Sequence, residues 1–417
     1  MDTQQQIEAL ARQAQTAARA LAKVSGATKN AALQAMAQAL HESREKIFAA
    51  NSTDVENGAR KGLSSALLNR LTLTNAKIEA MAEGCRSVAA LPDPIGRVLD
   101  GETRPNGLRI ERVRVPLGVV AVIYESRPNV TVDAAILALK AGNAVILRGG
   151  SEAIETNKVL AEIISDAAQS AGLPGGAIGF VESTDRAASA ILATQNGSID
   201  LIIPRGGEGL KKALMEVATV PVIFAAGGVC HVYVDESADM EMARAIAFNA
   251  KTTNPSVCNA AETLLVNRHI AETFLPAMAA QFFGAKVELR GDARARQLVP
   301  AMLEATEDDW NAEYLDLTLA VKIVDSLDEA IEHISRHGTA HSEAIVTQNF
   351  ARAERFLNEV DAAAVYVNAS TRFTDGFEFG LGAEVGISTQ KLHSRGPMGL
   401  EALTTTKYLV RGTGQIR

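Results

Sequence analysis

The chain has few cysteines, and they are scattered. Its 417 residues include three, Cys85, Cys230 and Cys258. An odd number without Cys-x-x-Cys spacing argues against a disulfide framework and against a cysteine-based metal site. No cluster of histidine, cysteine and aspartate indicates a metal ion elsewhere, so we expect none. Free thiols are typical of a reducing compartment, and we expect the protein in the cytoplasm.

Long apolar runs and an excess of positive charge are missing as well. No stretch approaches the roughly 20 apolar residues that cross a membrane. The N-terminus, MDTQQQIEALARQAQ, is polar and has no apolar signal core. The formal net charge is -8, whereas nucleic-acid binding proteins normally carry a basic face. We therefore expect neither a membrane partner nor a nucleic-acid partner.

The chain does contain strongly patterned sequence, and its length predicts about two or three domains. Residues 3–90 are rich in alanine and predict packed helices. From Gly118 short apolar runs alternate with helical segments; the runs are GVVAVIYE, NAVILRGG, AIGFVES, DLIIPRGG and PVIFAAGG. A second block of this kind starts near Val229. Such alternation is typical of parallel, doubly wound sheets, so we expect an α/β protein.

Glycine-rich segments follow several of the predicted strands. In doubly wound sheets ligands bind beyond the carboxyl ends of the strands. We therefore predict a nucleotide crevice at three segments: Arg148-Gly149-Gly150-Ser151, Arg205-Gly206-Gly207-Glu208 and Ala226-Gly227-Gly228. The GxGxxG dinucleotide fingerprint is absent, because the nearest string, Gly380-Leu381-Gly382 with Gly386, has the wrong spacing and follows no strand. A dinucleotide would therefore have to be bound through its phosphates by a different arrangement of residues.

Cys258 stands in a distinctive setting. A loop of small and polar residues (252–256) precedes it, and the apolar run 263–266 that follows predicts a strand. A loop presents a cysteine for chemistry, although a lone cysteine more often packs as a small apolar residue. Both interpretations are open at this point. Cys230, inside the apolar run VCHVYVD, and Cys85, in a helical segment, are expected to pack in the core.

Two further stretches alternate without an obvious core face. They are RIERVRV, from Arg109 to Val115, and LTTTKYLV, which begins at Leu403. Such strands lie on a surface or pair with another chain, and we favour the second.

Six segments carry a resemblance to a known family: VPLGVVAVIYESRPNVTVDAA, LKAGNAVILRGGSEA, LIIPRGGEGL, NAKTTNPSVCNAAETLLV, WNAEYLDLTLAVKIVDSLDEAI and LHSRGPMGLEALTTTKY. Through them the chain resembles, over nearly its whole length, the aldehyde dehydrogenase superfamily, and within it the branch that reduces an acyl phosphate of glutamate. That family has a doubly wound cofactor domain without the usual fingerprint, an α/β catalytic domain and a small β oligomerisation flap.

The resemblance implies domain boundaries in this chain. The cofactor-binding domain would comprise residues 1–104, 117–228 and 369–396, and the catalytic domain 229–368 with Cys258. The oligomerisation flap would comprise 105–116 and 397–417, and we expect a homo-oligomer.

The resemblance also implies roles for individual residues. Cys258 matches the nucleophile, and Asn129 matches the asparagine whose amide helps to form the oxyanion site. Glu313 matches the glutamate that holds the nicotinamide ribose, although an ordinary exposed carboxylate is an equal alternative. Arg127 is a candidate for holding the phosphoryl or α-carboxylate group of the substrate. Lys251 is a candidate for lowering the pKa of the Cys258 thiol or for binding the substrate phosphate. Each has a plain alternative, a structural ion pair for Arg127 and a solvated surface lysine for Lys251.

The expected cofactor is NADP(H). Arg148, Ser151 and Glu152 match the segment that holds the adenine ribose, where the family commonly has Lys-Pro instead of Arg148-Gly149. The forked donors of an arginine suit the 2′-phosphate of NADP. Near the pyrophosphate the matching residues are Gly206, Gly207 and Glu208, and Gly227 is expected to line the same crevice.

One departure from the family concerns the fate of the acyl-enzyme. Hydrolytic aldehyde dehydrogenases have a glutamate just before Leu-Gly-Gly, and this chain has Ala225 in the corresponding segment, Ala225-Ala226-Gly227-Gly228. The loss of that base favours exchange with phosphate over hydrolysis.

The resemblance then implies the reaction. NADPH would reduce L-glutamyl 5-phosphate to L-glutamate 5-semialdehyde and phosphate through a Cys258 thioester, in proline biosynthesis. The glutamate 5-kinase that makes the substrate is a possible partner. The alternatives are a hydrolytic or CoA-acylating aldehyde dehydrogenase, and a non-catalytic scaffold, which would be expected to have lost the nucleophile.

Overall fold

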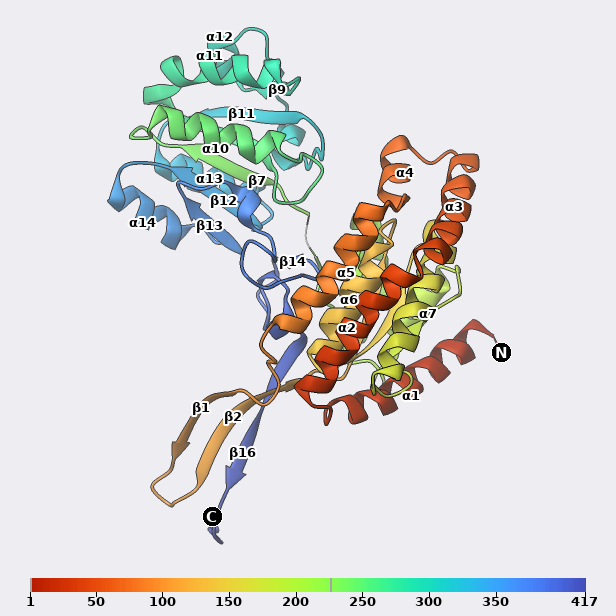
Figure 1. Ribbon diagram of the computed structural model, residues 1–417. Helices are drawn as coiled ribbons and strands as arrows, with labels where there is room; N and C mark the ends of the chain where they lie inside the picture. The colour runs from red at the N-terminus through yellow and green to blue at the C-terminus, as the bar shows by residue number, and fades with distance from the viewer. Residues whose placement is uncertain (1, 226) are drawn as a thin grey trace. The chain divides into compact units, whose positions relative to one another are not determined.

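The structure is a computed structural model that describes residues 2–225 and 227–417, without the side chains of residues 66 and 208 (Figure 1). The chain divides into two compact units. The first comprises the chain up to Ala225 with Gly380–Gly386 and Met398–Arg417. The second comprises the chain from Gly227 to Phe379 with Ile387–Pro397. Most of the predicted segment 369–396 thus belongs to the second unit, and the functional assignment of the domains stays a prediction.

Alanine-rich helices begin the first unit, as the sequence predicts. They are α1 (Thr3–Leu21), α2 (Gly26–Glu42), α3 (Arg44–Arg60), α4 (Ser65–Leu71) and α5 (Asn75–Ala90). Asp2, Ser25, Ser64 and Thr74 each accept a backbone N–H three residues ahead, which caps four of these helices. The apolar stripe of α1, including Ile7 and Leu21, is buried.

A parallel four-stranded sheet forms the centre of the first unit. Its order is β5 (Ile178–Phe180), β4 (Ala144–Arg148), β3 (Val119–Tyr124), β6 (Leu201–Arg205). The connecting helices are α6 (Asn129–Lys140), η1 (Ser151–Ala153), α7 (Ile154–Ser170), α8 (Ala187–Ala193) and α9 (Glu208–Val217). Every residue of β3 and β4 is buried, as expected for strands covered on both faces.

The prediction of a fifth strand at PVIFAAGG is wrong for the described residues. Only an isolated bridge forms, between Ile202 and Val222. Pro221 has no N–H to donate to a ladder. The run also crosses from one compact unit into the next, so its later residues do not continue along β6.

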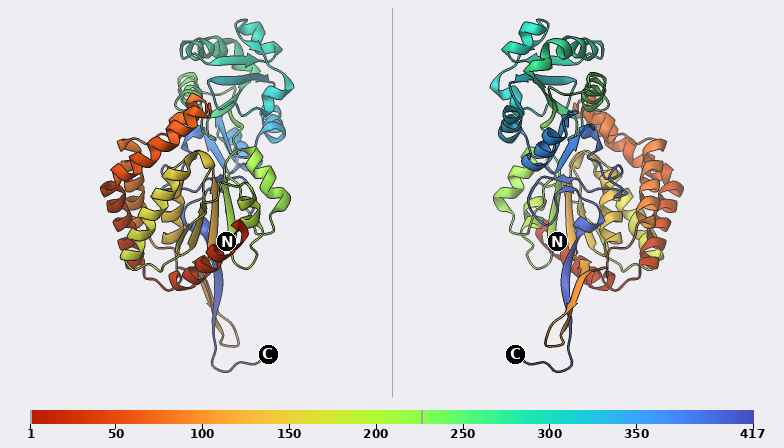
Figure 2. Two further views of the ribbon diagram at one scale, coloured as in Figure 1. Left: turned by 90° about the vertical axis from the view of Figure 1, so that its right-hand side faces the viewer. Right: turned by 90° about the vertical axis from the view of Figure 1, so that its left-hand side faces the viewer.

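A second, antiparallel sheet of the first unit joins distant parts of the chain. It consists of β1 (Val98–Thr103), β2 (Arg109–Pro116) and β16 (Thr404–Arg411), and η4 (Leu400–Leu403) leads into it. Arg109 lies opposite Arg411, and Pro116 lies opposite Thr404. The three strands extend away from the helices of their unit (Figure 2). The two surface stretches noted in the sequence are therefore partners, and β1, expected in the cofactor domain, joins them.

The second unit is built on a seven-stranded parallel sheet. Its order is β10 (Leu303–Glu304), β9 (Glu288–Gly291), β11 (Thr318–Val324), β8 (Ala261–Asn267), β7 (Cys230–Val234), β12 (Ser342–Val346), β13 (Ala364–Val367). The helices are α10 (Met240–Thr252), α11 (Arg268–Gly284), α12 (Ala293–Leu298), η2 (Glu307–Asn311), α13 (Leu327–His337), α14 (Phe350–Glu359) and η3 (Thr371–Phe373). A short ladder of β14 (Ile387–Ser388) and β15 (Gly396–Pro397) completes it.

Alternate residues of the second sheet enter two different cores. Leu264 packs with Phe274 and Met278 of α11, whereas its neighbour Leu265 packs with Ile334 of α13 and Phe356 of α14. Helices therefore cover both faces, as in a doubly wound sheet (Figure 1). Among the helices of the described residues, none is both long enough and apolar enough to cross a membrane.

Candidate active site

In the first unit, the predicted cofactor residues gather at the carboxyl edge of the four-stranded sheet. Arg148 ends β4, and Gly206 and Gly207 follow β6. The segment after β3 meets both of these ends. The backbone N–H of Gly207 donates to the Glu125 carboxylate at 3.1 Å, and the N–H of Glu125 donates to the carbonyl of Arg205 at 3.1 Å. Parallel strands bring these segments together because their carboxyl ends share one edge.

Glu152 joins the segment after β3 to the segment after β4. Its Oε1 accepts hydrogen bonds from the Ser126 backbone N–H at 2.5 Å and from the Ser126 hydroxyl at 2.7 Å. A Cβ on Gly150 would overlap the same oxygen, so any larger residue there would push the Glu152 carboxylate away from this position. Ser151 is exposed beside it. The side chain of Glu208 lies outside the described residues.

Arg148 is almost fully buried, at 8% exposure. Its Nη2 donates to the Asp185 carbonyl at 3.2 Å, and its Nε has no hydrogen-bond partner among the described residues. Burial lowers the pKa of Arg148, while the nearby carboxylates Glu152, Glu125 and Asp185 oppose that shift. An arginine with an unmet donor at this edge fits a phosphate group.

The start of α9 also fits an anion. Gly207 is its N-cap residue, and a Cβ there would meet nothing within 4 Å. The first N–H groups of a helix and its dipole attract phosphate. The chain's own residues are thus compatible with a nucleotide cofactor at this edge.

Asn129 is the first residue of α6, and its side chain is held from within that helix. Its Nδ2 donates to Asp133 Oδ2 at 2.8 Å. Burial raises the pKa of Asp133 to about 6, and the hydrogen bond from Asn129 opposes the rise. Arg127, two residues before Asn129, is exposed.

In the second unit, the loop from α10 to β8 carries Cys258. Its backbone carbonyl is closely packed: Cys230 Sγ lies 3.2 Å from the oxygen, and a Cβ on Gly228 would lie 1.6 Å from it. Cys258 itself is partly exposed, whereas Cys230 and Cys85 are buried, as the sequence predicts. Burial raises the pKa of the Cys85 thiol to about 12 and that of Cys230 well above its usual value. Cys258 is therefore the cysteine that can act as a nucleophile.

Glu313 is not an ordinary exposed carboxylate. Its Oε1 accepts the backbone N–H of Gly228 at 2.7 Å, and a Cβ on Gly227 would lie 2.5 Å from its Oε2. The carboxylate thus rests against the Gly227-Gly228 pair, whose second member touches the Cys258 carbonyl.

Lys251 is not a solvated lysine either. Both Lys251 and Glu262 are buried, and Lys251 Nζ lies 2.5 Å from Glu262 Oε2. Glu262 Oε1 also accepts the Leu315 backbone N–H at 3.2 Å. Burial lowers the pKa of Lys251 and raises that of Glu262 to about 7. The ammonium group is engaged inside the protein, and its role towards substrate stays a prediction.

One residue beside Cys258 has no counterpart in the sequence-based predictions. Arg372, in η3, donates from Nη1 to the side-chain oxygen of Asn259, the neighbour of Cys258. The only sequence signal is a polar run, ASTRFTDG, after a predicted strand. Nothing in the sequence places that run beside the cysteine loop.

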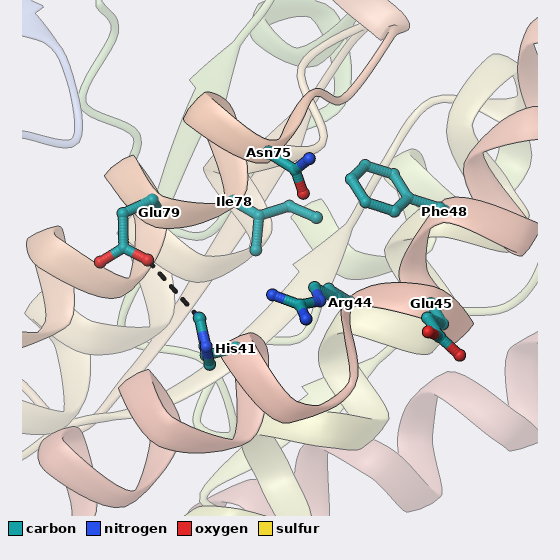
Figure 3. Close-up of a pocket in the computed structure, with 7 residues that line it drawn as sticks. All are labelled: His41, Arg44, Glu45, Phe48, Asn75, Ile78 and Glu79. Atoms are coloured by element: carbon teal, nitrogen blue, oxygen red, sulfur yellow. Dashed lines mark ion pairs between the residues drawn. The ribbon is translucent and has the colours of Figure 1, made fainter.

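A separate cavity of about 610 Å³ lies among the N-terminal helices of the first unit (Figure 3). His41 and Glu79 form an ion pair at its rim, with 3.6 Å between His41 Nδ1 and Glu79 Oε2. The other lining residues are Arg44, Glu45, Phe48, Asn75 and Ile78. None of the site residues predicted from the sequence lines it.

Comparison with known proteins places the chain in a family. The sequence pattern described as the aldehyde dehydrogenase family matches residues 1–316. An acetylating aldehyde dehydrogenase from Geobacillus thermoglucosidasius has the same fold, with a TM-score of 0.70 and 22% identity over 100% of this chain and 98% of that one. The chain therefore belongs to the aldehyde dehydrogenase family, and the predicted α/β fold is confirmed.

Relatives with higher sequence identity narrow the assignment within the aldehyde dehydrogenase family. γ-Glutamyl phosphate reductases from Halothermothrix orenii and Moorella thermoacetica are 57% and 58% identical over 417 residues, which is 100% of each chain. The crystal structure of a γ-glutamyl phosphate reductase from Thermotoga maritima has a TM-score of 0.96 and 47% identity, covering 100% of both chains. Within its family, the chain belongs with the γ-glutamyl phosphate reductases.

Replacing Gly228 should disable the nucleophile loop. In Gly228→Ala the new Cβ would overlap the Cys258 carbonyl, so the loop must shift, and a displacement of about 1 Å at a reacting group costs about a hundredfold in rate. We expect at least that loss of turnover, together with a lower melting temperature because the overlap is with backbone. Gly284→Ala is the matched control, because a Cβ there meets nothing within 4 Å. Equal turnover in Gly228→Ala and wild type would contradict this account.

Removing Lys251 should destabilise the protein. In Lys251→Met the Glu262 carboxylate loses its partner, and breaking a buried pair costs about 3–5 kcal/mol. Burial raises the pKa of Glu262 in the folded state to about 7, from an ordinary value of 4.5. Stability from this group is therefore present below pH 4.5 and lost as pH rises through about 7. The variant's deficit, measured by urea unfolding, should accordingly be larger at pH 8 than at pH 5.

Two further variants complete that measurement. Lys251→Met with Glu262→Gln should recover part of the loss, because no uncompensated charge remains. Lys391→Met, which breaks an exposed pair with Asp361, should leave the unfolding free energy unchanged within error. A Lys251→Met variant as stable as wild type at pH 8 would rule out a structural role for the pair.

Proposed function

We propose that the chain reduces L-glutamyl 5-phosphate to L-glutamate 5-semialdehyde and phosphate, with NADPH as reductant and Cys258 as nucleophile. The reaction is that of the γ-glutamyl phosphate reductases with which the chain belongs. One observation carries the assignment of the nucleophile. Cys258 is partly exposed on a loop whose carbonyl is closely packed, whereas the other two thiols are buried.

The first step is acyl transfer to sulfur. The Cys258 thiolate attacks the acyl carbon, a C–S bond forms, and the C–O bond to phosphate breaks, so that phosphate leaves with the bonding electrons. When bound, the reduced nicotinamide supplies the hydride that converts the thioester to a thiohemiacetal. The C–S bond of the thiohemiacetal then breaks, and its electrons go to sulfur. This step releases the aldehyde and regenerates the Cys258 thiolate.

Asn129 is proposed as an oxyanion donor, on the strength of the family resemblance. A preorganised amide donor typically contributes about a hundredfold or more in rate. Within its own unit the contact with Asp133 holds the amide in one orientation, which lowers the cost of ordering it. Arg127 remains a candidate for a charged group of the substrate.

Phosphate exchange, rather than hydrolysis, is the proposed fate of the thioester. The segment before Gly227-Gly228 has Ala225 where hydrolytic relatives have a glutamate base. A methyl side chain cannot deprotonate water, so the thioester persists until hydride or phosphate reaches it.

NADP(H) is proposed over NAD(H) because of Arg148. In this proposal its guanidinium binds the 2′-phosphate, with Ser151 and Glu152 at the adenine ribose. The helix start at Gly207 holds the pyrophosphate, alongside Gly206, Glu208 and Gly227, and Glu313 holds the nicotinamide ribose. The unmet Nε of Arg148 supports this assignment.

The assembly is proposed to be a homo-oligomer joined through the sheet of β1, β2 and β16. Val98, Tyr408 and Val410 are more than half exposed on that sheet. The glutamate 5-kinase that supplies L-glutamyl 5-phosphate is proposed as a further partner.

Phosphate dependence tests the reaction. With L-glutamate 5-semialdehyde, the wild-type protein should reduce NADP only when inorganic phosphate is present. Cys258→Ala should lose the activity, whereas Cys85→Ala, which removes a core thiol, should keep it. Phosphate-independent formation of the free acid would favour a hydrolytic dehydrogenase, and full turnover of Cys258→Ala would exclude the cysteine mechanism.

Cofactor choice tests Arg148. Arg148→Leu should raise the KM for NADP at least about tenfold while leaving the KM for NAD nearly unchanged, since only NADP carries the 2′-phosphate. Arg12→Gln is the control, because Arg12 lies exposed on α1 and pairs with Glu8. An equal rise for both cofactors would assign Arg148 a purely structural role.

A further inference from the structure

The turn η3 is fastened to the residue that follows Cys258. The Thr371 hydroxyl donates to the Asn259 carbonyl at 2.7 Å. The Asn259 amide donates to the carbonyls of Arg372 at 3.2 Å and Thr374 at 2.9 Å. Asn259 also accepts from the Arg372 guanidinium. Because Asn259, Thr371 and Thr374 are buried, these bonds are shielded from water and hold Arg372 beside the nucleophile's own peptide.

A second set of contacts also links η3 to the Cys258 loop, through Ser342, His341 and Cys230. The Thr374 hydroxyl lies 2.6 Å from that of Ser342, and the Ser342 hydroxyl lies 2.8 Å from His341 Nδ1. His341 Nδ1 lies 3.7 Å from Cys230 Sγ, which in turn contacts the Cys258 carbonyl. The turn that carries Arg372 and the loop that carries Cys258 therefore form one rigid assembly within the second unit.

Arg372 lacks a carboxylate partner in this assembly. Its side chain is half-buried, and no carboxylate among the described residues forms an ion pair with it. Its Nε is buried without a hydrogen-bond partner among the described residues, and its Nη1 donates to the neutral side chain of Asn259. Burial lowers the pKa of Arg372, while the charges of Asp375 and Cys258 oppose the shift. A desolvated guanidinium with free donors is most stable beside an anion.

We propose that Arg372 is a catalytic residue whose guanidinium binds an anion at the Cys258 sulfur. The proposal rests on Cys258 being the nucleophile. The anion has two sources, the thiolate itself before attack and the phosphoryl group of the acyl phosphate. Binding the thiolate increases the share of Cys258 that is deprotonated and reactive. Binding the phosphoryl group neutralises the leaving group as the C–O bond breaks.

The experiment compares Arg372→Gln and Arg372→Lys with wild type. Arg296→Gln is the matched control, since Arg296 lies on α12 and pairs with Glu304 at 3.1 Å. In the first arm, iodoacetamide alkylation of Cys258 is followed from pH 5 to pH 9 without substrate. In the second arm, the KM for inorganic phosphate is measured in the NADP-reducing direction.

If Arg372 holds the thiolate, the midpoint of alkylation in Arg372→Gln rises by about one pH unit or more. If Arg372 holds the phosphoryl group, the KM for phosphate rises at least about tenfold while that for NADP stays constant. Arg372→Lys keeps the charge without the fork, so its midpoint should stay near wild type in either case, whereas its phosphate KM should rise only if the phosphoryl group is the anion. A shift in either arm supports the proposal and identifies the source.

Normal values in both arms for a folded Arg372→Gln would overturn the proposal, as would equal shifts in Arg296→Gln. If Arg372→Gln fails to fold, Arg372→Met decides, because it also removes the charge, and normal values in both arms for that variant then reject anion binding by the guanidinium. A wild-type protein without phosphate-dependent activity would refute the proposed function. The alkylation arm would still test Arg372 in that case.

Discussion

The contact between Gly228 and the Cys258 carbonyl is the constraint on which the Cys258 loop of the second unit depends. Only a residue without a Cβ allows the segment leading to β7 to approach this closely. The same glycine donates its N–H to Glu313, and Cys230 two residues later contacts the same carbonyl. The Cys258 loop, the segment of Glu313 and the segment before β7 therefore meet at Gly228, which fixes the loop while the thiol stays partly exposed.

Buried polar groups around this point serve to specify geometry more than to stabilise the fold. Lys251 with Glu262, and His231 with Glu343 at 2.9 Å, are fully enclosed ion-pair or hydrogen-bond partners. Desolvation offsets much of the attraction in such pairs. Because separating either pair would leave a buried group without its partner, each pair favours the arrangement that keeps its two residues together.

The first unit holds its loop segments together with carboxylates at the edge of its sheet rather than with buried ion pairs. Its sheet ends bring the segments after β3, β4 and β6 to one edge, and carboxylates tie them together. Glu152 binds Ser126, and Glu125 binds Gly207. Side chains from three segments thus line a glycine-rich edge that can approach a phosphate, although the GxGxxG pattern is absent.

The amino-acid sequence alone determined the α/β class, most strands of both sheets, and the loop setting of Cys258, because apolar periodicity and turn residues act locally. It missed β9, β10 and α12, which are short, and it also missed α14; it failed for PVIFAAGG, which is apolar without forming a strand. Only the tertiary structure decided which charges are buried. Lys251 looked like a surface lysine until Glu262 enclosed it, and Arg372 lies 113 residues from Asn259 along the chain. No local pattern encodes such a pairing, since it arises when separate strands of one sheet bring their loops together.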